Sequence, residues 1–161
     1  VEQVIYGVTC GSGSILFRYD PYDGKEGSVS ALGNLCDGRF LDSGRKDIPY
    51  STLAFALDAV NRRIYFAPSA RGYETERYEE TFGSAESHHL ILYDLKTGKR
   101  TDLGVLKTTD GRRVFGCEAA SVGTDGTLYI CGQVEVSNPE KGTALIKGAP
   151  VALHILKYTA Q

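Results

Sequence analysis

Arginine and tyrosine side chains gather in the stretches that separate the apolar segments of this 161-residue chain. A guanidinium group forms forked hydrogen bonds with a carboxylate, and a tyrosine ring offers a sugar an apolar face with a polar tip. The set therefore predicts a binding site for a saccharide or another small polar ligand. The alternative is that these residues are solvated loop groups, with charges paired to neighbouring glutamates. The candidate ligand-binding residues of this kind are Arg39, Tyr50, Arg71, Tyr73, Tyr78, Arg112 and Arg113.

Glu118 and two adjacent histidines are the candidates for catalysis or metal binding. The Glu118 carboxylate follows Arg112 and Arg113 closely and could act as a general base. We favour the structural alternative, in which it pairs with those arginines. His88 and His89 are candidate ligand-binding residues, but neighbours in a strand point to opposite faces and do not form a two-histidine metal motif. We predict no metal site, and a divalent cation would need ligands from outside the chain.

Net charge and hydropathy argue against two classes of partner. The formal net charge is −2, from 18 basic and 20 acidic residues, so no global positive field favours nucleic acid. No apolar run approaches the roughly 20 residues of a membrane helix, and no signal-like segment opens the chain. We expect a soluble chain without nucleic-acid or membrane partners, in a compartment that the sequence leaves open. Because the chain begins at Val1 and contains no Met, we expect it to be a piece of a longer protein.

Internal repeats organise the chain. An apolar run that ends in tyrosine occurs three times, at Tyr6, Tyr65 and Tyr129. A Tyr-Asp pair followed by a Leu-Gly pair appears within 19–33 and again within 93–104. Such internal similarity is typical of a repeat architecture with one supersecondary unit per copy. The sequence therefore predicts three such units.

Hydrophobic periodicity predicts that one complete unit is four antiparallel strands. Apolar residues form segments of strand length, and Gly, Asn or Asp residues separate them. A repeated four-stranded antiparallel unit is typical of a β-propeller blade. The predicted strand pairs are 51–57 with 63–66, 119–123 with 127–131, and 89–94 with a strand around 100–105.

We therefore predict an all-β fold that is part of a β-propeller, with about two and a half four-stranded blades in an incomplete ring. The chain, 1–161, is a single segment of this kind. Residues 3–35 would supply the second to fourth strands of a first blade, 50–106 a complete second blade, and 117–159 the first three strands of a third. Open blade faces would expose apolar surface, so we expect another chain, a symmetry copy or a missing segment to complete the ring.

Two strings of the sequence, YDLKTGKRTDLGVL and DGRRVFGCEAASVGTDGTLYICG, resemble the repeats of bacterial β-propeller proteins. The similar family comprises propellers of the oligogalacturonate lyase type and uncharacterised carbohydrate-associated relatives. The resemblance implies a scaffold that hosts hydrolases, lyases, lectins and docking platforms alike. In the lyase type it also implies a histidine cluster for a divalent cation, for which this chain supplies one or two candidates.

The unrepeated stretches predict where a site lies. In a propeller, connections from the second to the third strand and from one blade to the next emerge on the same face. Long connections on a rigid scaffold are where binding and catalytic residues concentrate. This loop face is therefore the predicted site. The long connections are 36–49, 68–88, 107–116 and 132–151.

Three functional hypotheses follow. The first is a ligand-binding propeller segment that recognises a saccharide or other small polar ligand at the loop face. The second is a polysaccharide or oligosaccharide lyase or hydrolase, in which Glu118, an arginine and a histidine act with residues from missing blades. The third is an architectural unit of an oligomer. No cofactor is expected.

Alignment of the repeats also bears on the cysteines and on His154. If the turn at 124–127 pairs its two end residues, Cys131 lies opposite Ala120 and points away from Cys117, so no disulfide joins the two. Matching Tyr158 to Tyr93 places His154 at the position of His89. A histidine that recurs at one position of a repeat suggests a scaffold role.

Overall fold

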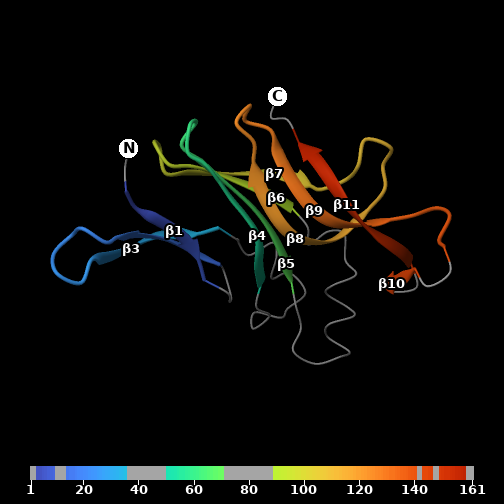
Figure 1. Cartoon of the computed structure of the whole chain (residues 1–161), viewed down its shortest axis with the longest axis horizontal. Helices are drawn as coiled ribbons and strands as arrows, with labels where there is room; N and C mark the ends of the chain where they lie inside the picture. Colours follow the sequence, from blue (N-terminus) through green and yellow to red (C-terminus); the bar gives the residue numbers. More distant parts are fainter. Residues whose placement is uncertain are drawn as a thin grey trace.

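The computed structural model describes residues 3–9, 14–35, 50–70, 89–140, 143–146 and 149–158. These residues form three antiparallel sheets of three, four and four strands (Figure 1), which confirms the predicted all-β class. No helix that could cross a lipid bilayer occurs in this part of the chain. Five candidate site residues lie outside the described residues, and the side chain of Tyr50 does too. The five are Arg39, Arg71, Tyr73, Tyr78 and His88.

The described strands pair mainly with their sequence neighbours. The first sheet has the order β1-β2-β3, the second β4-β5-β6-β7 and the third β8-β9-β11-β10. The edge strand β10 lies within the predicted connection 132–151 and was not predicted. The bounds are β1 (Ile5–Val8), β2 (Ile15–Asp20), β3 (Ser28–Asn34), β4 (Tyr50–Asp58), β5 (Arg63–Ala70), β6 (His89–Asp94), β7 (Lys99–Val105), β8 (Val114–Val122), β9 (Leu128–Glu135), β10 (Ala144–Ile146) and β11 (Ala149–Tyr158).

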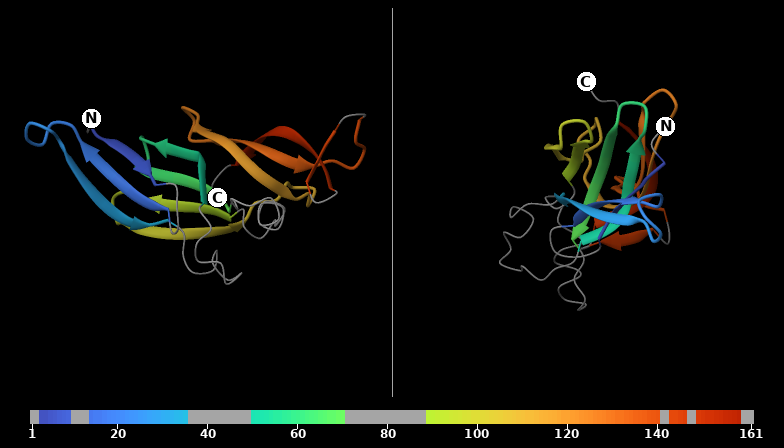
Figure 2. Two further views of the ribbon diagram at one scale, coloured as in Figure 1. Left: turned by 90° about the horizontal axis from the view of Figure 1, so that it is seen from below. Right: turned by 90° about the vertical axis from the view of Figure 1, so that its left-hand side faces the viewer.

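The second sheet lies between the first and the third, and both of its faces are covered (Figure 2). Successive residues of a strand point to opposite faces. Ile64 and Phe66 of β5 accordingly belong to the apolar core shared with the first sheet. Tyr65 and Ala67 belong to the core shared with the third sheet. A strand buried on both faces needs apolar residues at nearly every position, which explains the continuous apolar run of β5.

Equivalent positions of the repeat differ in exposure from sheet to sheet. Ile5, Ile64 and Leu128 each precede the repeated tyrosine by one residue. Ile64 and Leu128 are 0% and 1% exposed, whereas Ile5 is 57% exposed. The first two pack against the sheet that precedes theirs, and no described sheet precedes that of Ile5.

The outermost sheets therefore each present an apolar face to solvent. We call the open side of the first sheet the first end face and the open side of the third sheet the third end face. The first end face carries Ile5, Phe17 and Val29, and the third carries Tyr129, Leu153 and Ile155.

The aspartates of the two Tyr-Asp pairs organise the turns after β2 and β6. Asp20 Oδ1 accepts a hydrogen bond from the backbone N–H of Tyr22 at 3.0 Å. Asp94 Oδ1 accepts from the N–H groups of Lys96 and Thr97, both at 2.9 Å. This is the Asx-turn geometry that favours aspartate at the start of a turn. The backbone hydrogen bonds from Tyr22 and Thr97 are the main cause that lowers the pKa of Asp20 and Asp94 respectively.

The glycines of the two Leu-Gly pairs accommodate irregularities in the sheets. Gly33 and Gly104 have φ values of +106° and +93°, which side chains with a Cβ rarely adopt. A register shift occurs in the pairing of β2 with β3 and again in that of β6 with β7. The repeated glycine thus lies in the bulged last strand of each of these two sheets, β3 and β7 respectively.

The β8–β9 hairpin differs by one residue from the predicted register. Its turn closes through the N–H of Gly123, which donates to the Thr127 carbonyl at 2.8 Å, rather than through the residue pair at 124 and 127. Cys131 therefore lies opposite Ala119, and the predicted pairing with Ala120 is wrong. Cys117 is buried in the core between the second and third sheets, and both described cysteines are free thiols, as predicted.

Candidate functional site

The connection from β7 to β8 is a compact turn that presents two of the candidate arginines. The backbone N–H of Thr108 donates to the Arg112 carbonyl at 3.1 Å, and the N–H of Arg112 donates to Thr108 Oγ1 at 2.8 Å. Gly111 adopts a φ of +82°, and its N–H donates to the Thr108 carbonyl at 2.9 Å. Lys107 pairs with Arg113 in an isolated bridge. These bonds fix the backbone from which Arg112 and Arg113 extend.

Each arginine is held by a carboxylate. Arg112 Nε donates to Asp110 Oδ2 at 2.8 Å, and its Nη1 donates to the Glu135 backbone carbonyl at 3.4 Å. Arg113 forms a forked pair with Glu135, with distances of 3.0 Å to Oε2 and 2.8 Å to Oε1. The Arg113 guanidinium also lies 4.8 Å from the centre of the Phe115 ring. The two arginines therefore have fixed orientations.

The same contacts set the protonation of the two carboxyls. The Thr108 hydroxyl donates to Asp110, and this bond together with Arg112 lowers the pKa of Asp110. The hydrogen bonds from Arg113 lower the pKa of Glu135. Both groups are ionised near neutral pH, so charge-assisted hydrogen bonds hold the arginines.

Glu118 lies in a bulge of β8, where the pairing with β9 shifts between Cys117 and Ala119. Its Oε1 accepts a hydrogen bond from Gln133 Nε2 of β9 at 3.3 Å. Glu118 does not line the cavity described below. The carboxylates that pair with Arg112 and Arg113 are Asp110 and Glu135.

His89, at the start of β6, is joined to the neighbouring strand. Its Nδ1 lies 2.9 Å and 3.0 Å from the two carboxylate oxygens of Asp102 on β7. Asp102 Oδ1 also accepts from the N–H of Gly104 at 2.7 Å, which ties the histidine to the bulge. Among the described residues, no group of three or more potential ligands could hold a metal ion. Tyr50 begins β4 opposite Ala70.

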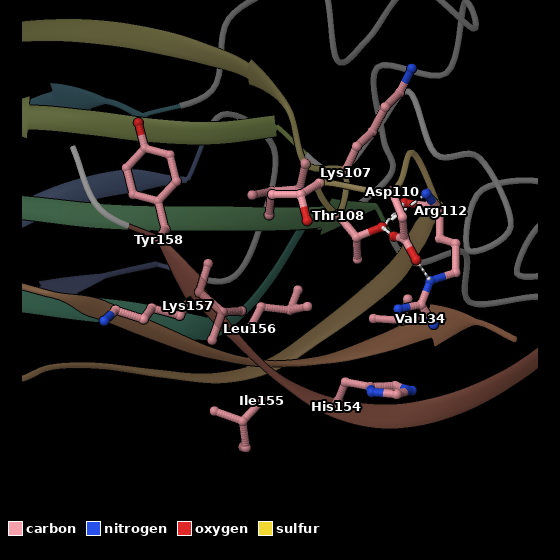
Figure 3. A pocket seen from close by; sticks show the side chains of 13 residues that line it. Lys107, Thr108, Asp110, Arg112, Val134, His154, Ile155, Leu156, Lys157 and Tyr158 are labelled. Carbon is pink, nitrogen blue, oxygen red and sulfur yellow. Dashed lines mark hydrogen bonds and ion pairs between the residues drawn. The ribbon is translucent and has the colours of Figure 1, made fainter. Parts of the chain in front are cut away.

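A cavity of about 380 Å³ lies beside this turn (Figure 3). Its loop side is formed by the connection, and its strand side by β9 and β11. Arg112 is the only one of the described candidate site residues that lines the cavity. The loop side includes Lys107, Thr108, Asp110 and Arg112, and the strand side includes Ile130, Val134, His154, Leu156 and Tyr158.

Sequence reasoning missed the residues that position the arginines. Asp110 carries a local signal, since Thr108, Asp110 and Gly111 have the composition of a tight turn. Glu135 carries none, because it reaches Arg113 only through the pairing of β8 with β9. His154 was interpreted as scaffold, and its Nε2 is buried with no hydrogen-bond partner among the described residues.

Comparison of the chain with protein-family models, with curated protein sequences and with solved structures finds no match.

Proposed function

We propose that the three sheets are consecutive blades of an incomplete β-propeller, and that the segment binds a small polar ligand at its loop face. Three observations support the blade assignment. Strands are added in sequence order within the first two sheets, the sheets stack face to face, and the repeated residues occupy equivalent positions. A propeller repeats this arrangement radially.

The observation that carries the binding proposal is Arg112, which Asp110 and the Glu135 carbonyl hold in place at the loop side of the cavity, with Arg113 fixed beside it. A guanidinium group has five N–H donors, and the hydrogen bonds that Arg112 and Arg113 make with Asp110 and Glu135 use two donors of each arginine. Donors already fixed by Asp110 and Glu135 bind a ligand with less loss of side-chain entropy. Lys107 adds a third cation to the cluster, which leaves an excess of positive charge.

This chemistry fits a saccharide that carries a carboxylate. Forked donors recognise the carboxylate, and the Thr108 hydroxyl on the same loop side suits a hydroxyl group of the sugar. Binding is a better interpretation than catalysis, because Glu118, the candidate general base, is hydrogen-bonded to Gln133 in the sheet and does not line the cavity.

The test is a titration of the protein with an oligogalacturonate of two or three sugar units. Calorimetry measures the affinity, and NMR of the backbone amides locates the binding site. We expect amide shifts in 106–113 and at least tenfold weaker binding for Arg112→Ala. Arg112→Lys should also bind more weakly, because it keeps the charge and loses the fork. Lys99→Ala is the matched control, since it removes one exposed cation outside the cavity and should change nothing. A neutral oligosaccharide that binds equally well, or shifts confined to other segments, would refute the proposal.

A partner that completes the ring is also part of the proposal. The first and third end faces are the equivalents of faces that are buried between sheets inside the chain. Another chain or a symmetry copy that packs on them would remove these apolar side chains from water. An architectural role of this kind is compatible with ligand binding at the loop face.

A further inference from the structure

Among the described strands, none pairs with the outer edge of β11 over most of its length. β10 pairs with β11 only from Ala149 to Val151, and no other described strand lies along 152–158 on that side. In the second sheet the equivalent edge of β6 is paired with β7 from His89 to Asp94. In the first sheet β3 covers the edge of β2 in the same way. An uncovered edge presents backbone groups that bind an added strand.

His154 shows what such a strand would have to supply. It occupies the position of His89 in the repeat, and His89 Nδ1 is bonded to Asp102 of the adjacent fourth strand. His154 Nε2 is buried and has no hydrogen-bond partner among the described residues. Burial of a polar atom without a hydrogen-bond partner destabilises the folded protein. A carboxylate placed beside the His154 ring would supply such a partner.

The cavity lies where side chains of that strand would project. In the second sheet, Arg100 and Asp102 extend from β7 toward the neighbouring sheet, and Arg100 Nη1 donates to the Asn34 carbonyl at 3.4 Å. The equivalent space beside β11 is the strand side of the cavity, bounded by His154, Leu156 and Tyr158 (Figure 3). Figure 3 shows Leu156 and Tyr158 on β11 at the end of the cavity opposite Arg112.

We infer that the edge of β11 from Leu153 to Tyr158 binds an extended, antiparallel strand with an aspartate placed opposite Leu156. This register copies the pairing of Ile91 with Asp102, and it brings the carboxylate to His154. Exposed apolar side chains at Leu153 and Ile155 add contact area on the other face. The inference does not rest on the proposed ligand, which uses the loop side of the cavity.

The test uses the octapeptide KRTDLGVL, which has the sequence of residues 99–106, added to the intact protein. Binding is measured by fluorescence anisotropy of the labelled peptide and by NMR of backbone amides and histidine rings. We expect amide shifts along 153–158, a change in the ring resonances of His154, and unchanged ring resonances of His89. The matched peptide KRTNLGVL should bind about tenfold more weakly, because it lacks the charge-assisted bond.

The variant His154→Gln completes a double-mutant cycle with the aspartate-to-asparagine change in the peptide. It should bind the two peptides with equal affinity, since the carboxylate no longer meets an imidazole. Arg112→Ala should leave peptide binding unchanged, which separates this site from the proposed ligand site. Equal affinities of the two peptides for the unsubstituted protein, shifts at the first end face instead of β11, or no binding at millimolar peptide would each overturn the inference. The peptide comparison requires no substitution in the protein, so its outcome does not depend on whether a variant folds.

Discussion

Hydrogen bonds from the chain's own turns and from neighbouring arginines hold several acidic side chains in their ionised form. Backbone N–H groups are the main cause for Asp20, Asp94 and Asp125, whereas the Thr108 hydroxyl acts on Asp110 and the Arg113 side chain on Glu135. In all five residues the pKa lies below its ordinary value. The protein should therefore depend on these charges for part of its stability.

Acidification should destabilise the fold. A carboxyl whose pKa is lower in the folded state contributes stability above its unfolded-state pKa, and this contribution is lost as the pH falls through the folded-state pKa. We expect the free energy of unfolding to decrease below about pH 4, which urea denaturation at a series of pH values measures by circular dichroism. Asp94→Asn keeps the acceptor oxygen for Lys96 and Thr97 but cannot titrate, so its stability should depend less on pH. A flat profile from pH 7 to pH 3 would contradict this account.

The two described cysteines should differ in reactivity. Burial, and then the nearby negative charge of Glu118, raises the pKa of Cys117 to about 12. Cys131 is only partly buried and lies on the side of the third end face. Because the thiolate is the reactive form, iodoacetamide at pH 8 should label Cys131 well before Cys117. Peptide mass spectrometry measures both rates, and unfolded protein, in which the rates should converge, is the control. Equal labelling of the folded protein would argue against the burial of Cys117.

At the level of strands, the Leu-Gly bulge links three features of the second sheet. Gly104 supplies the left-handed residue, its N–H is bonded to Asp102, and Asp102 holds His89. The bulge therefore orients the carboxylate that joins β6 to β7.

Gly104→Ala should destabilise the protein by about 1 kcal/mol. A Cβ at this position would meet nothing within 4 Å, so the cost comes from the φ of +93° and not from a collision. Gly104→Asn should cost less, because asparagine tolerates left-handed conformations better. Urea denaturation measures the free energy of unfolding of each variant, and the dependence of this free energy on urea concentration should be the same for all of them. An alanine variant as stable as the unsubstituted protein would show that the bulge is not under this constraint.

The strands were predictable where periodicity is strong, and their irregularities were not. The apolar runs of β5, β6 and β9 alternate or continue over enough residues to define strands, and these strands are present. The predicted register of β8 against β9 was wrong by one residue, because the turn begins at Gly123 and not at residue 124. β10 has three residues and was missed, since a segment that short has no measurable period.

At the level of the whole molecule, the two end faces are complementary in kind. Among the described residues, both contacts between sheets join the face that carries the repeated tyrosine of one sheet to the face that carries the apolar residue before the tyrosine in the next. The third end face carries a repeated tyrosine, Tyr129. The first end face carries an apolar residue that precedes a repeated tyrosine, Ile5. A second copy could therefore continue the stack from head to tail, as heterologous contacts do.

Charged substitutions on the two end faces should block this association separately. Sedimentation of the unsubstituted protein should show a mass that rises with concentration. Ile5→Asp and Ile155→Asp should each be monomeric, yet an equimolar mixture should contain dimers, because each variant keeps the face that the other lacks. Thr101→Ala, within the second sheet, is the control and should associate normally. An unsubstituted protein that stays at 17.5 kDa at high concentration would exclude a second copy as the partner.

Only part of the candidate site could be derived from the sequence. Arg112 and Arg113 were placed on a long connection and lie there, because charged residues after a strand seldom belong to a core. The partner of Arg113, Glu135, is 22 positions away, and its proximity depends on a strand register that bulges shift. Pairings of this kind follow from tertiary structure alone.

The second sheet packs between the first and the third, and this position should determine the order in which the protein unfolds locally. In a linear array each unit is stabilised by its neighbours, and the central one has two. Amide protons of β5 and β6 should therefore exchange with solvent more slowly than those of β1, β2 and β11, with opening spreading inward from both ends. Native-state deuterium exchange would record this gradient, and uniform protection across the three sheets would instead indicate a single cooperative unit.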